Sequence, residues 1–394
     1  MNARFHGRNQ VAIIGYAQSP VLRSAMESLG QLTITTALSA IKDAGLHVAQ
    51  IDGFTTGSLL PAYGDTSVVD GRDIVSGQWL AERLSIHPRW SCDFSGYGQL
   101  PGSVILAVEA LLSGSAEYVL LHRSLSNPTG KYHDSAIVNA VGDKQWTAPQ
   151  GLWGPPVEVA FVANEYMHRY GTSRADLGRV VVNLREAGAQ NPWSYWHGKP
   201  ITLADYELAP LIADPISRLD CDIPVQSASA FVLTRADRAI DGPHKPVWVT
   251  GWAQGRPNTP LKAYWTLDEM NAAGNRTAQM LYEHTGLAVT DIDHPQLYDA
   301  FSPFLYFWTE ALGFCGAGEA AAFLVDGGGE RLGMFNSGGS LGNGRLHGLA
   351  QMLDCYLQLS GRAGDRQLHQ PTVGLAAHAS PIVGGVVAYS AEQF

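Results

Sequence analysis

The chain has 394 residues, of which 45% are hydrophobic and 16% are charged, and its formal net charge is −10. This length and apolar content exclude a coiled coil and a disordered chain, and indicate either two domains or one large one. The negative charge and the lack of any run of basic residues argue against a nucleic-acid partner.

Hydrophobic stretches in the sequence are too short to cross a membrane, because the longest reach about ten residues and a spanning helix needs about 20. The first residues lead directly into a short apolar segment that ends in a turn, which is unlike a secretory signal peptide. We therefore expect a soluble, cytoplasmic protein. The cysteines lie far apart without metal-ligand spacing, so we expect free thiols and no metal site.

The first predicted elements are a strand at residues 11–16 (VAIIGY), a helix that ends at Gly45, and a strand at residues 51–54. A strand at residues 90–94, a glycine-containing turn, a helix at residues 101–112 and a strand at residues 118–122 follow. The helix at 101–112 is apolar nearly all round. Such a helix is expected inside the protein, between sheets.

The same order of elements recurs in the second half. Residues 247–252 (VWVTGW) predict a strand, a helix ends near Gly286, and another strand follows at residues 295–298. Residues 334–335, which correspond to the strand at 90–94, are expected to form a strand before the turn NSGG. A helix then runs over residues 344–359, and a hairpin pairs strands 372–377 and 383–389. We therefore expect two matching βαβαβαββ halves, residues 1–240 and 241–394, whose two sheets enclose a central helical layer.

The first half carries an insertion that the second half lacks. Its strand at residues 118–122 finds a hairpin partner only at residues 230–234, so a segment of roughly 100 residues, about 124–225, stands between them. This segment contains several tryptophans and prolines. Because long inserted segments in compact folds usually cover a functional site, we expect this one to lie over the pocket.

The duplicated unit resembles the thiolase superfamily, whose fold is an α/β five-layer αβαβα sandwich. Further stretches resemble the sterol-carrier-protein-type thiolases and their lipid-transfer-protein relatives, namely residues 170–172 (YGT), 212–215 (IADP), 219–221 (LDC), 298–301 (YDAF), 312–316 (LGFCG) and 336–339 (NSGG). The resemblance covers nearly the whole chain. It implies a homodimer and an acyl-CoA substrate, with no cofactor other than the coenzyme A of that substrate.

The catalytic cysteines of a thiolase are missing from the positions that the resemblance assigns to them. Tyr97 stands where the nucleophile is expected, at the start of the first central helix, and residues 378–380 (HAS) replace the second cysteine. The Gly-His-Pro loop of the family is matched by residues 344–346 (GRL). A covalent acyl-enzyme is therefore not expected. Cys92 falls in a predicted strand and stays as an alternative, displaced nucleophile.

One branch of the family lacks these cysteines and cleaves carbon–carbon bonds by retro-aldol chemistry in steroid side-chain degradation. A β-hydroxyacyl-CoA there yields a ketone and a shorter acyl-CoA. That branch carries a tyrosine at the head of the Tyr-Asp-x-Phe loop, matched by Tyr298, and a second tyrosine ahead of Ile-His-Gly. Here Arg345 replaces the second tyrosine, while His347 and Gly348 are kept. The resemblance also implies a small OB-fold/zinc-ribbon partner subunit.

Retro-aldol cleavage requires a base for the β-hydroxyl proton, donors to the thioester enolate, and an acid that protonates the enolate. Tyr298 is the expected base, provided that positive charge lowers its pKa from about 10. Arg345 is the expected source of that charge and of hydrogen bonds to the enolate oxygen. Asp299 is expected to orient these groups, and His347, His378 or a water molecule is expected to supply the proton.

Substrate binding is assigned to Gly338 and Gly339, whose backbone N–H groups suit an oxygen atom, and to Tyr97 and Ser380. Several of the catalytic candidates also have a purely structural interpretation, as a core aromatic, an ion pair or a helix cap. Three functions therefore stay open. The leading hypothesis is an aldolase for a β-hydroxyacyl-CoA with a bulky, apolar acyl group. The alternatives are a thiolase or acetyltransferase that uses Cys92, and a non-catalytic acyl-CoA-binding subunit.

Overall fold

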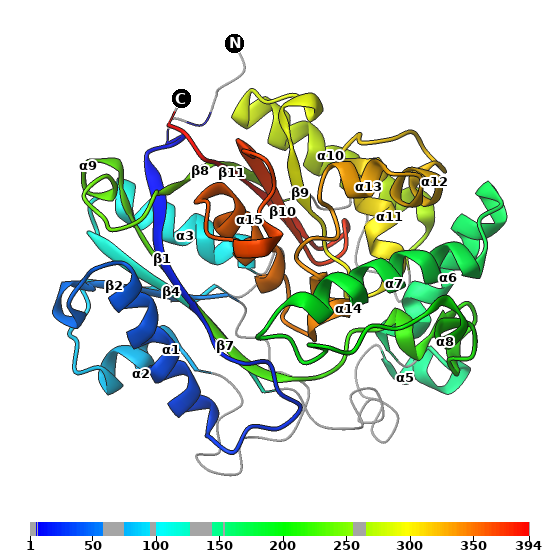
Figure 1. Ribbon diagram of the computed structural model, residues 1–394, viewed down its shortest axis with the longest axis horizontal. Helices are drawn as coiled ribbons and strands as arrows, with labels where there is room; N and C mark the ends of the chain where they lie inside the picture. The colour runs from blue at the N-terminus through cyan, green and yellow to red at the C-terminus, as the bar shows by residue number, and fades with distance from the viewer. Residues whose placement is uncertain are drawn as a thin grey trace.

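The computed structural model describes residues 5, 7–57, 75–94, 100–126, 144–152, 154–254 and 265–393. Its centre is a nine-stranded mixed sheet with the strand order β3-β2-β4-β7-β1-β8-β11-β10-β9 (Figure 1). The strands are β1 (Val11–Gln18), β2 (Gly53–Thr56), β3 (Trp90–Ser91), β4 (Tyr118–Ser126), β7 (Gln226–Arg235), β8 (Val247–Ala253), β9 (His294–Gln296), β10 (Val373–His378) and β11 (Gly385–Ser390).

The strand order repeats on either side of the middle of the sheet. Counted outward, the first half runs β1, β7, β4, β2, β3 and the second half runs β8, β11, β10, β9. Both predicted hairpins, β4 with β7 and β10 with β11, are antiparallel pairs. The strand expected at residues 334–335 is not formed. The reason is local, because the N–H group of Met334 bonds to the carbonyl oxygen of Gly329 in a turn that closes a short helix.

The two halves are hydrogen-bonded to each other through β1 and β8. Ala12 pairs with Trp248 and Ile13 pairs with Val247 in antiparallel register. The two sheets expected from the sequence are therefore joined edge to edge into one continuous sheet. This junction fixes the position of one half relative to the other.

Two helices fill the space between the two halves of the sheet, α3 (Leu100–Leu112) and α15 (Leu349–Leu359). Every residue of α15 is buried. The alternation of side chains along β1 separates this central core from an outer one. Val11 and Ile13 pack with α3 and α15, whereas Ala12 and Ile14 pack with α1 (Leu29–Asp43). On the second half the corresponding outer helix is α10 (Leu267–Thr285).

The ends of these helices follow local sequence signals. The Ser28 side chain accepts a hydrogen bond from the N–H group of Gln31 at the start of α1, and Gly286 has a φ of 69° at the end of α10. Helix α15 begins at Leu349 rather than at residue 344 as expected. His347 and Gly348 have φ angles of 51° and 88°, which exclude both residues from the helix.

The inserted segment, the second half and the rest of the first half supply the remaining elements. The insertion forms α5 (Lys144–Thr147), α6 (Pro155–Tyr170), α7 (Arg174–Gln190), α8 (Leu203–Glu207), β5 (Leu211–Ala213) and β6 (Ile216–Ser217). The other helices are α2 (Gly77–Arg83), α9 (Ala236–Ala239), α11 (Ser302–Ala311), α12 (Ala320–Val325), α13 (Gly328–Arg331) and α14 (Gly339–Asn343). Figure 1 shows α6, α7 and α8 at the opposite end of the molecule from α1 and α2.

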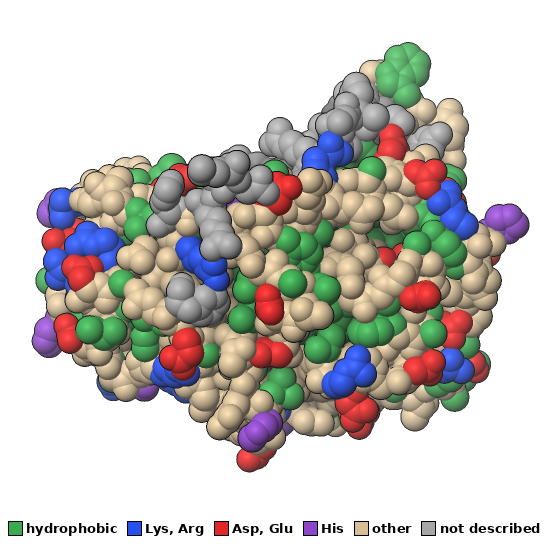
Figure 2. All heavy atoms as spheres, turned by 90° about the horizontal axis from the view of Figure 1, so that it is seen from above, with side chains coloured by type: hydrophobic (Ala, Val, Ile, Leu, Met, Phe, Trp, Pro, Cys, Tyr) green, Lys and Arg blue, Asp and Glu red, His purple; other side chains and the backbone are tan. Residues whose placement is uncertain are grey.

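The described surface mixes charges of both signs. On the face seen in Figure 2, Lys and Arg side chains lie singly or in small groups, with Asp and Glu nearby. Within the described ranges, no helix is both long enough and apolar enough to cross a bilayer.

Candidate active site

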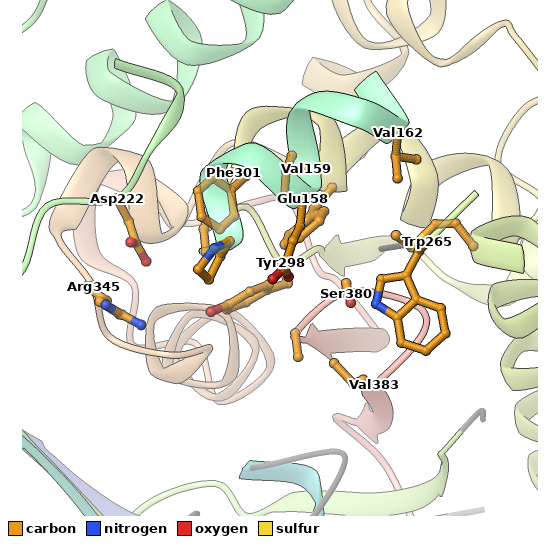
Figure 3. Close-up of a pocket in the computed structure, with 15 residues that line it drawn as sticks. Glu158, Val159, Val162, Asp222, Trp265, Tyr298, Phe301, Arg345, Ser380 and Val383 are labelled. Carbon is orange, nitrogen blue, oxygen red and sulfur yellow. The ribbon is translucent and has the colours of Figure 1, made fainter. Parts of the chain in front are cut away.

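A pocket of about 390 Å³ lies where the insertion meets the loops of the second half (Figure 3). The described residues that line it are Pro155, Glu158, Val159, Val162, Asp222, Trp265, Met270, Tyr298, Ala300, Phe301, Phe304, Arg345, Ala379, Ser380 and Val383. The first four belong to α6, and most of the others follow β9 or β10. One wall of the pocket is therefore formed by the inserted segment.

The pocket is chemically divided. In Figure 3 the side chains of Asp222 and Arg345 lie at one end, and the hydroxyl of Tyr298 points toward them. Trp265 and Val383 line the other end. A polar reacting group can therefore be held beside an apolar substituent.

Tyr298 stands two residues after β9 and is only 6% exposed. Its ring stacks on Phe304, with 6.3 Å between the ring centroids. Burial raises the pKa of Tyr298 well above 10, Asp222 and Asp299 raise it further, and Arg123 opposes them. The pKa of Tyr298 is therefore raised, whereas the expected role as a base requires it to be lowered. The phenol keeps its proton and is suited to be a proton donor.

His347 lies between two arginine side chains. Nη2 of Arg123 is 2.6 Å from Nδ1 of His347, and Nε of Arg345 donates to Nε2 at 2.8 Å. Burial lowers the pKa of His347 well below 6.5, and the two guanidinium groups lower it further. An imidazolium is therefore absent at neutral pH. The uncharged ring accepts a hydrogen bond from Arg345, which does not fit the expected role of His347 as a proton donor.

His378 ends β10 and is fully buried. Burial lowers its pKa to about 3, so this imidazole is also uncharged at neutral pH. It packs so closely on Gly348 that a Cβ atom there would overlap Nδ1 of His378. Ser380, two residues further along the chain, lines the pocket. The structure thus brings Ser380, but not His378, to the pocket wall.

Asp299 is buried and accepts three hydrogen bonds. Its Oδ1 atom accepts from the N–H group of Ser340 at 2.7 Å and from Nε2 of Gln351 at 2.8 Å. Its Oδ2 atom accepts from the N–H group of Leu341 at 3.0 Å. Burial raises the pKa of Asp299 to about 7 in spite of these bonds. The carboxyl group therefore holds the start of α14.

The glycine loop has a structural role that differs from the expected one. The N–H group of Gly338 donates to the carbonyl oxygen of Phe335 at 2.8 Å, and that of Gly339 donates to Oγ of Ser337 at 2.9 Å. Both donors are therefore used inside the protein. Neither glycine is among the residues that line the pocket, so the assignment of these N–H groups to the substrate is corrected.

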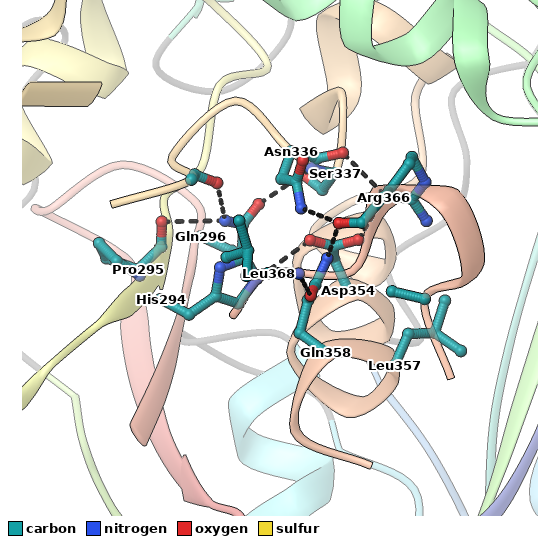
Figure 4. A network of polar contacts seen from close by, with 12 residues as sticks. His294, Pro295, Gln296, Asn336, Ser337, Asp354, Leu357, Gln358, Arg366 and Leu368 are labelled. Carbon is teal, nitrogen blue, oxygen red and sulfur yellow. Dashed lines mark hydrogen bonds and ion pairs between the residues drawn. The ribbon is translucent and has the colours of Figure 1, made fainter. Parts of the chain in front are cut away.

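A buried polar network connects the glycine loop to β9 and α15 (Figure 4). Nε2 of His294 lies 3.0 Å from Oδ2 of Asp354, and Nη1 of Arg366 is 2.6 Å from Oδ1 of Asp354. The neighbouring Gln296 accepts a hydrogen bond from the N–H group of Ser337 at 3.3 Å. The network connects β9, α15 and the glycine loop, and so fixes the segment that carries Tyr298.

Asp222 reaches the pocket from the end of the insertion. A β-bridge between Cys221 and Phe301 brings the two segments together, and the N–H group of Asp222 donates to the carbonyl oxygen of Ala300 at 2.9 Å. Its Oδ2 atom is buried and has no hydrogen-bond partner among the described residues. Burial raises the pKa of Asp222 well above 3.8, and Asp299 raises it further.

Known proteins resemble this chain along most of its length. Residues 264–391 match the family model "Thiolase C-terminal domain-like". The "17-hydroxy-3-oxo-4-pregnene-20-carboxyl-CoA lyase" of Mycobacterium tuberculosis is 32% identical, with 89% of this chain and 92% of the relative covered. The chain belongs to the thiolase superfamily.

Two further relatives place it more narrowly within the thiolase superfamily. The "Steroid side-chain-cleaving aldolase" of Thermomonospora curvata is 32% identical over 86% of this chain and 87% of its own. A solved structure described as "Ltp2-ChsH2(DUF35) aldolase" superimposes with a TM-score of 0.83 at 29% identity, covering 97% of this chain and 98% of that one. The predicted α/β thiolase fold, a five-layer αβαβα sandwich built from two similar halves, is confirmed.

The described cysteines do not supply the nucleophile of a thiolase. Cys92 is exposed next to the edge strand β3, and none of the described lining residues of the pocket is a cysteine. Tyr97, the expected counterpart of the thiolase nucleophile, lies outside the described residues. The candidate site of this thiolase-superfamily member is lined instead by Tyr298, Arg345 and the carboxyl groups of Asp222 and Glu158.

Three polar residues at the pocket or beside it were not predicted from the sequence, namely Asp222, Glu158 and Arg123. The stretch ending at Cys221 did carry a signal, because it resembles the family and directly precedes Asp222. Glu158 and Arg123 stand in a helix and a strand without any local motif. Only the fold brings them to the pocket or to His347.

Proposed function

We propose that this chain cleaves a β-hydroxyacyl-CoA by retro-aldol chemistry, giving a ketone and a shorter acyl-CoA. The observation that carries the proposal is the pocket itself, where Tyr298 and Arg345 face one polar end and no described lining residue is a cysteine. The names of the two 32% identical relatives, a lyase and an aldolase, support the same reaction class.

The groups in the pocket suit the charge that develops during cleavage. When the bond between the α- and β-carbons breaks, its electron pair forms the enolate of the shorter thioester. Arg345 is held by His347 and presents fixed N–H donors to the enolate oxygen. The phenol of Tyr298 keeps its proton and gives it to the enolate carbon.

The apolar end of the pocket favours a bulky acyl group. Trp265, Val162 and Val383 lie at this end in Figure 3, and Phe304 and Met270 also line the pocket. A volume of about 390 Å³ falls in the range of roughly 300–1,000 Å³ that is usual for small-molecule pockets. The names of both relatives refer to steroids, which supports a fused-ring acyl group.

The assembly and cellular setting are part of the same proposal. We propose a homodimer that is soluble and cytoplasmic and needs no cofactor beyond the coenzyme A of its substrate. The halves divide at residue 240, and the insertion at about 124–225 covers the site. A small OB-fold/zinc-ribbon subunit is the proposed partner, and the description "Ltp2-ChsH2(DUF35) aldolase" supports a two-component enzyme.

The test is to incubate the purified protein, alone and with such a partner, with fused-ring β-hydroxyacyl-CoA esters. We expect ketone and shorter acyl-CoA in equal amounts, and a large loss of rate in Tyr298→Phe. Tyr118→Phe is the matched control, because that ring lies on β4 near Arg238, outside the pocket. Unchanged cleavage in Tyr298→Phe removes the role of Tyr298. Binding without turnover indicates the non-catalytic alternative, and acyl transfer to Cys92 indicates the thiolase alternative.

A further inference from the structure

Asp222 is a half-buried acid of the pocket wall, and protein contacts do not explain its carboxyl group. Its backbone is fixed to the Tyr298–Phe301 segment through the Ala300 carbonyl and the neighbouring Cys221–Phe301 bridge. Its Oδ2 atom has no partner in the part of the chain that the structure describes. An unsatisfied buried carboxyl oxygen is costly, so its retention needs a reason outside folding stability.

Neighbouring acids are used differently. Asp299 accepts hydrogen bonds from Ser340, Leu341 and Gln351, and these bonds hold α14 in place. Asp220 accepts from the hydroxyl of Tyr206 at 2.8 Å and from the N–H group of Ser217 at 2.7 Å. The carboxyl groups of Asp299 and Asp220 therefore stabilise the local structure through these hydrogen bonds.

The histidines near the pocket are also unsuited to be the base. Both ring nitrogens of His347 face arginine groups, and His378 lies behind Gly348 rather than on the pocket wall. Tyr298 holds its own proton because it is buried. Among the described residues, the carboxyl groups that line the pocket are those of Asp222 and Glu158, so the base is sought there.

We propose that Asp222 is the catalytic base that removes the β-hydroxyl proton of the substrate. The inference rests on the proposed function and deepens it. Asp222 differs from Glu158 by its fixed backbone in the Tyr298–Phe301 segment and by its open Oδ2 atom. In Figure 3 its carboxyl group lies at the same end of the pocket as Arg345 and the Tyr298 hydroxyl.

Asp222 and Tyr298 together account for every proton that moves in the reaction. The Asp222 carboxylate takes the hydroxyl proton, the β-carbon becomes the ketone carbonyl, and the electrons of the broken carbon–carbon bond form the enolate. Tyr298 protonates the enolate carbon, and the resulting phenolate recovers a proton from Asp222. No oxidant, reductant or further reactant is needed, and both residues return to their starting states.

The electrostatics of the two side chains agree with these roles. Burial raises the pKa of Asp222 and so makes its carboxylate a stronger base than a solvent-exposed one. The charge of Asp222 in turn raises the pKa of Tyr298, so ionisation of one group opposes ionisation of the other. A pair of acids that share one negative charge is suited to pass a proton between them.

The experiment compares Asp222→Asn with Glu158→Gln and with Asp241→Asn, an exposed control outside the pocket. We expect Asp222→Asn to lower kcat by about 100- to 10,000-fold with little change in KM, because binding groups remain while the base is lost. Unfolding midpoints and binding of a non-cleavable acyl-CoA show whether each variant is folded.

A second variant separates chemistry from structure. In Asp222→Ala, added formate is expected to restore part of the cleavage rate, because a small carboxylate can occupy the vacated space; chloride is expected to restore none. The proposal is overturned if Asp222→Asn keeps more than a tenth of kcat, or if formate fails to rescue a folded, substrate-binding Asp222→Ala protein. A collapse of kcat in Glu158→Gln alone transfers the role to Glu158. A wild-type protein without any cleavage refutes the proposed function itself.

Discussion

Nη2 of Arg123 lies 2.6 Å from Nδ1 of His347, so a strand of the first half contacts the loop that precedes α15 in the second half. Arg123 is 3% exposed, and its charge is the one that opposes the raised pKa of Tyr298. Through His347, Arg123 also supports the side chain of Arg345. The two halves of the fold therefore meet at the polar end of the pocket.

This relationship predicts the effect of Arg123→Met. Loss of the guanidinium removes the support of His347, so Arg345 is displaced from the enolate oxygen. We expect kcat to fall by about 10- to 100-fold while KM changes little, because misplacement by about 1 Å has effects of this size. Steady-state kinetics provide the measurement, with Arg89→Met at an exposed ion pair as the control. A kcat within twofold of wild type contradicts this role of Arg123.

The glycine loop predicts a difference between two alanine variants. Gly339 and Gly361 have φ angles of 58° and 75°, so alanine at either position costs about 1–2 kcal/mol of backbone strain. At Gly361 the added Cβ meets open space, whereas at Gly339 it overlaps the carboxyl group of Asp299.

Gly339→Ala is therefore expected to lose about 1–3 kcal/mol more free energy of unfolding than Gly361→Ala. Urea denaturation measures both values under the same conditions. Equal losses of the free energy of unfolding in the two variants show that the overlap with Asp299 does not destabilise the protein.

Buried histidines predict a loss of stability in acid. Burial lowers the pKa of His378 to about 3 and that of His122 to about 4, from an ordinary value of 6.5. The unfolded chain therefore binds more protons than the folded one below about pH 6.5, and stability falls as the pH drops from there toward 3. Asp299 acts in the opposite direction, because burial raises its pKa to about 7. Its contribution to the free energy of unfolding is largest below about pH 4 and is lost as the pH rises through 7.

The variant that isolates this effect is His378→Gln. We expect its unfolding midpoint to fall less than that of the wild type between pH 7 and pH 5, because one of the groups that must become protonated is gone. Thermal melts across this range provide the comparison. A parallel decline of the two proteins excludes His378 as a source of acid sensitivity.

The apolar end of the pocket predicts selectivity for the acyl group. Trp265→Ala removes an aromatic wall and is expected to raise KM for a fused-ring β-hydroxyacyl-CoA by about 10-fold or more, as burial of one large apolar side chain contributes about 1.5–3 kcal/mol. KM for a short-chain substrate is expected to change little. Trp146→Ala, at a side chain that is 73% exposed, is the control. Equal changes in KM for both substrates show that the fused-ring acyl group does not bind against Trp265.

Much of the fold is readable from the sequence because its signals are local or periodic. The apolar helix at Leu100–Leu112, the cap at Gly286 and the paired strands β10 and β11 all follow from spacing and turn residues. The later start of α15 depends on positive φ angles at His347 and Gly348, and histidine at such an angle is not signalled by composition. The junction of β1 with β8 joins segments more than 200 residues apart and leaves no local pattern.

The site divides in the same way. Tyr298, Arg345 and Ser380 were found through motifs and do line the pocket. The supposed substrate donors at Gly338 and Gly339 are used internally, which depends on contacts that spacing does not encode. Asp222 comes from the end of the insertion and joins the Tyr298 segment through backbone pairing that only the folded chain makes.

The most direct measurement follows a single reaction mixture by mass spectrometry. The protein, with its small partner where required, is given a fused-ring β-hydroxyacyl-CoA without free coenzyme A, and the products and the intact protein are weighed over time. We predict ketone and shorter acyl-CoA in a one-to-one ratio, with no mass added to the protein. Cleavage that instead requires free coenzyme A and leaves an acyl group on a cysteine contradicts a retro-aldol reaction.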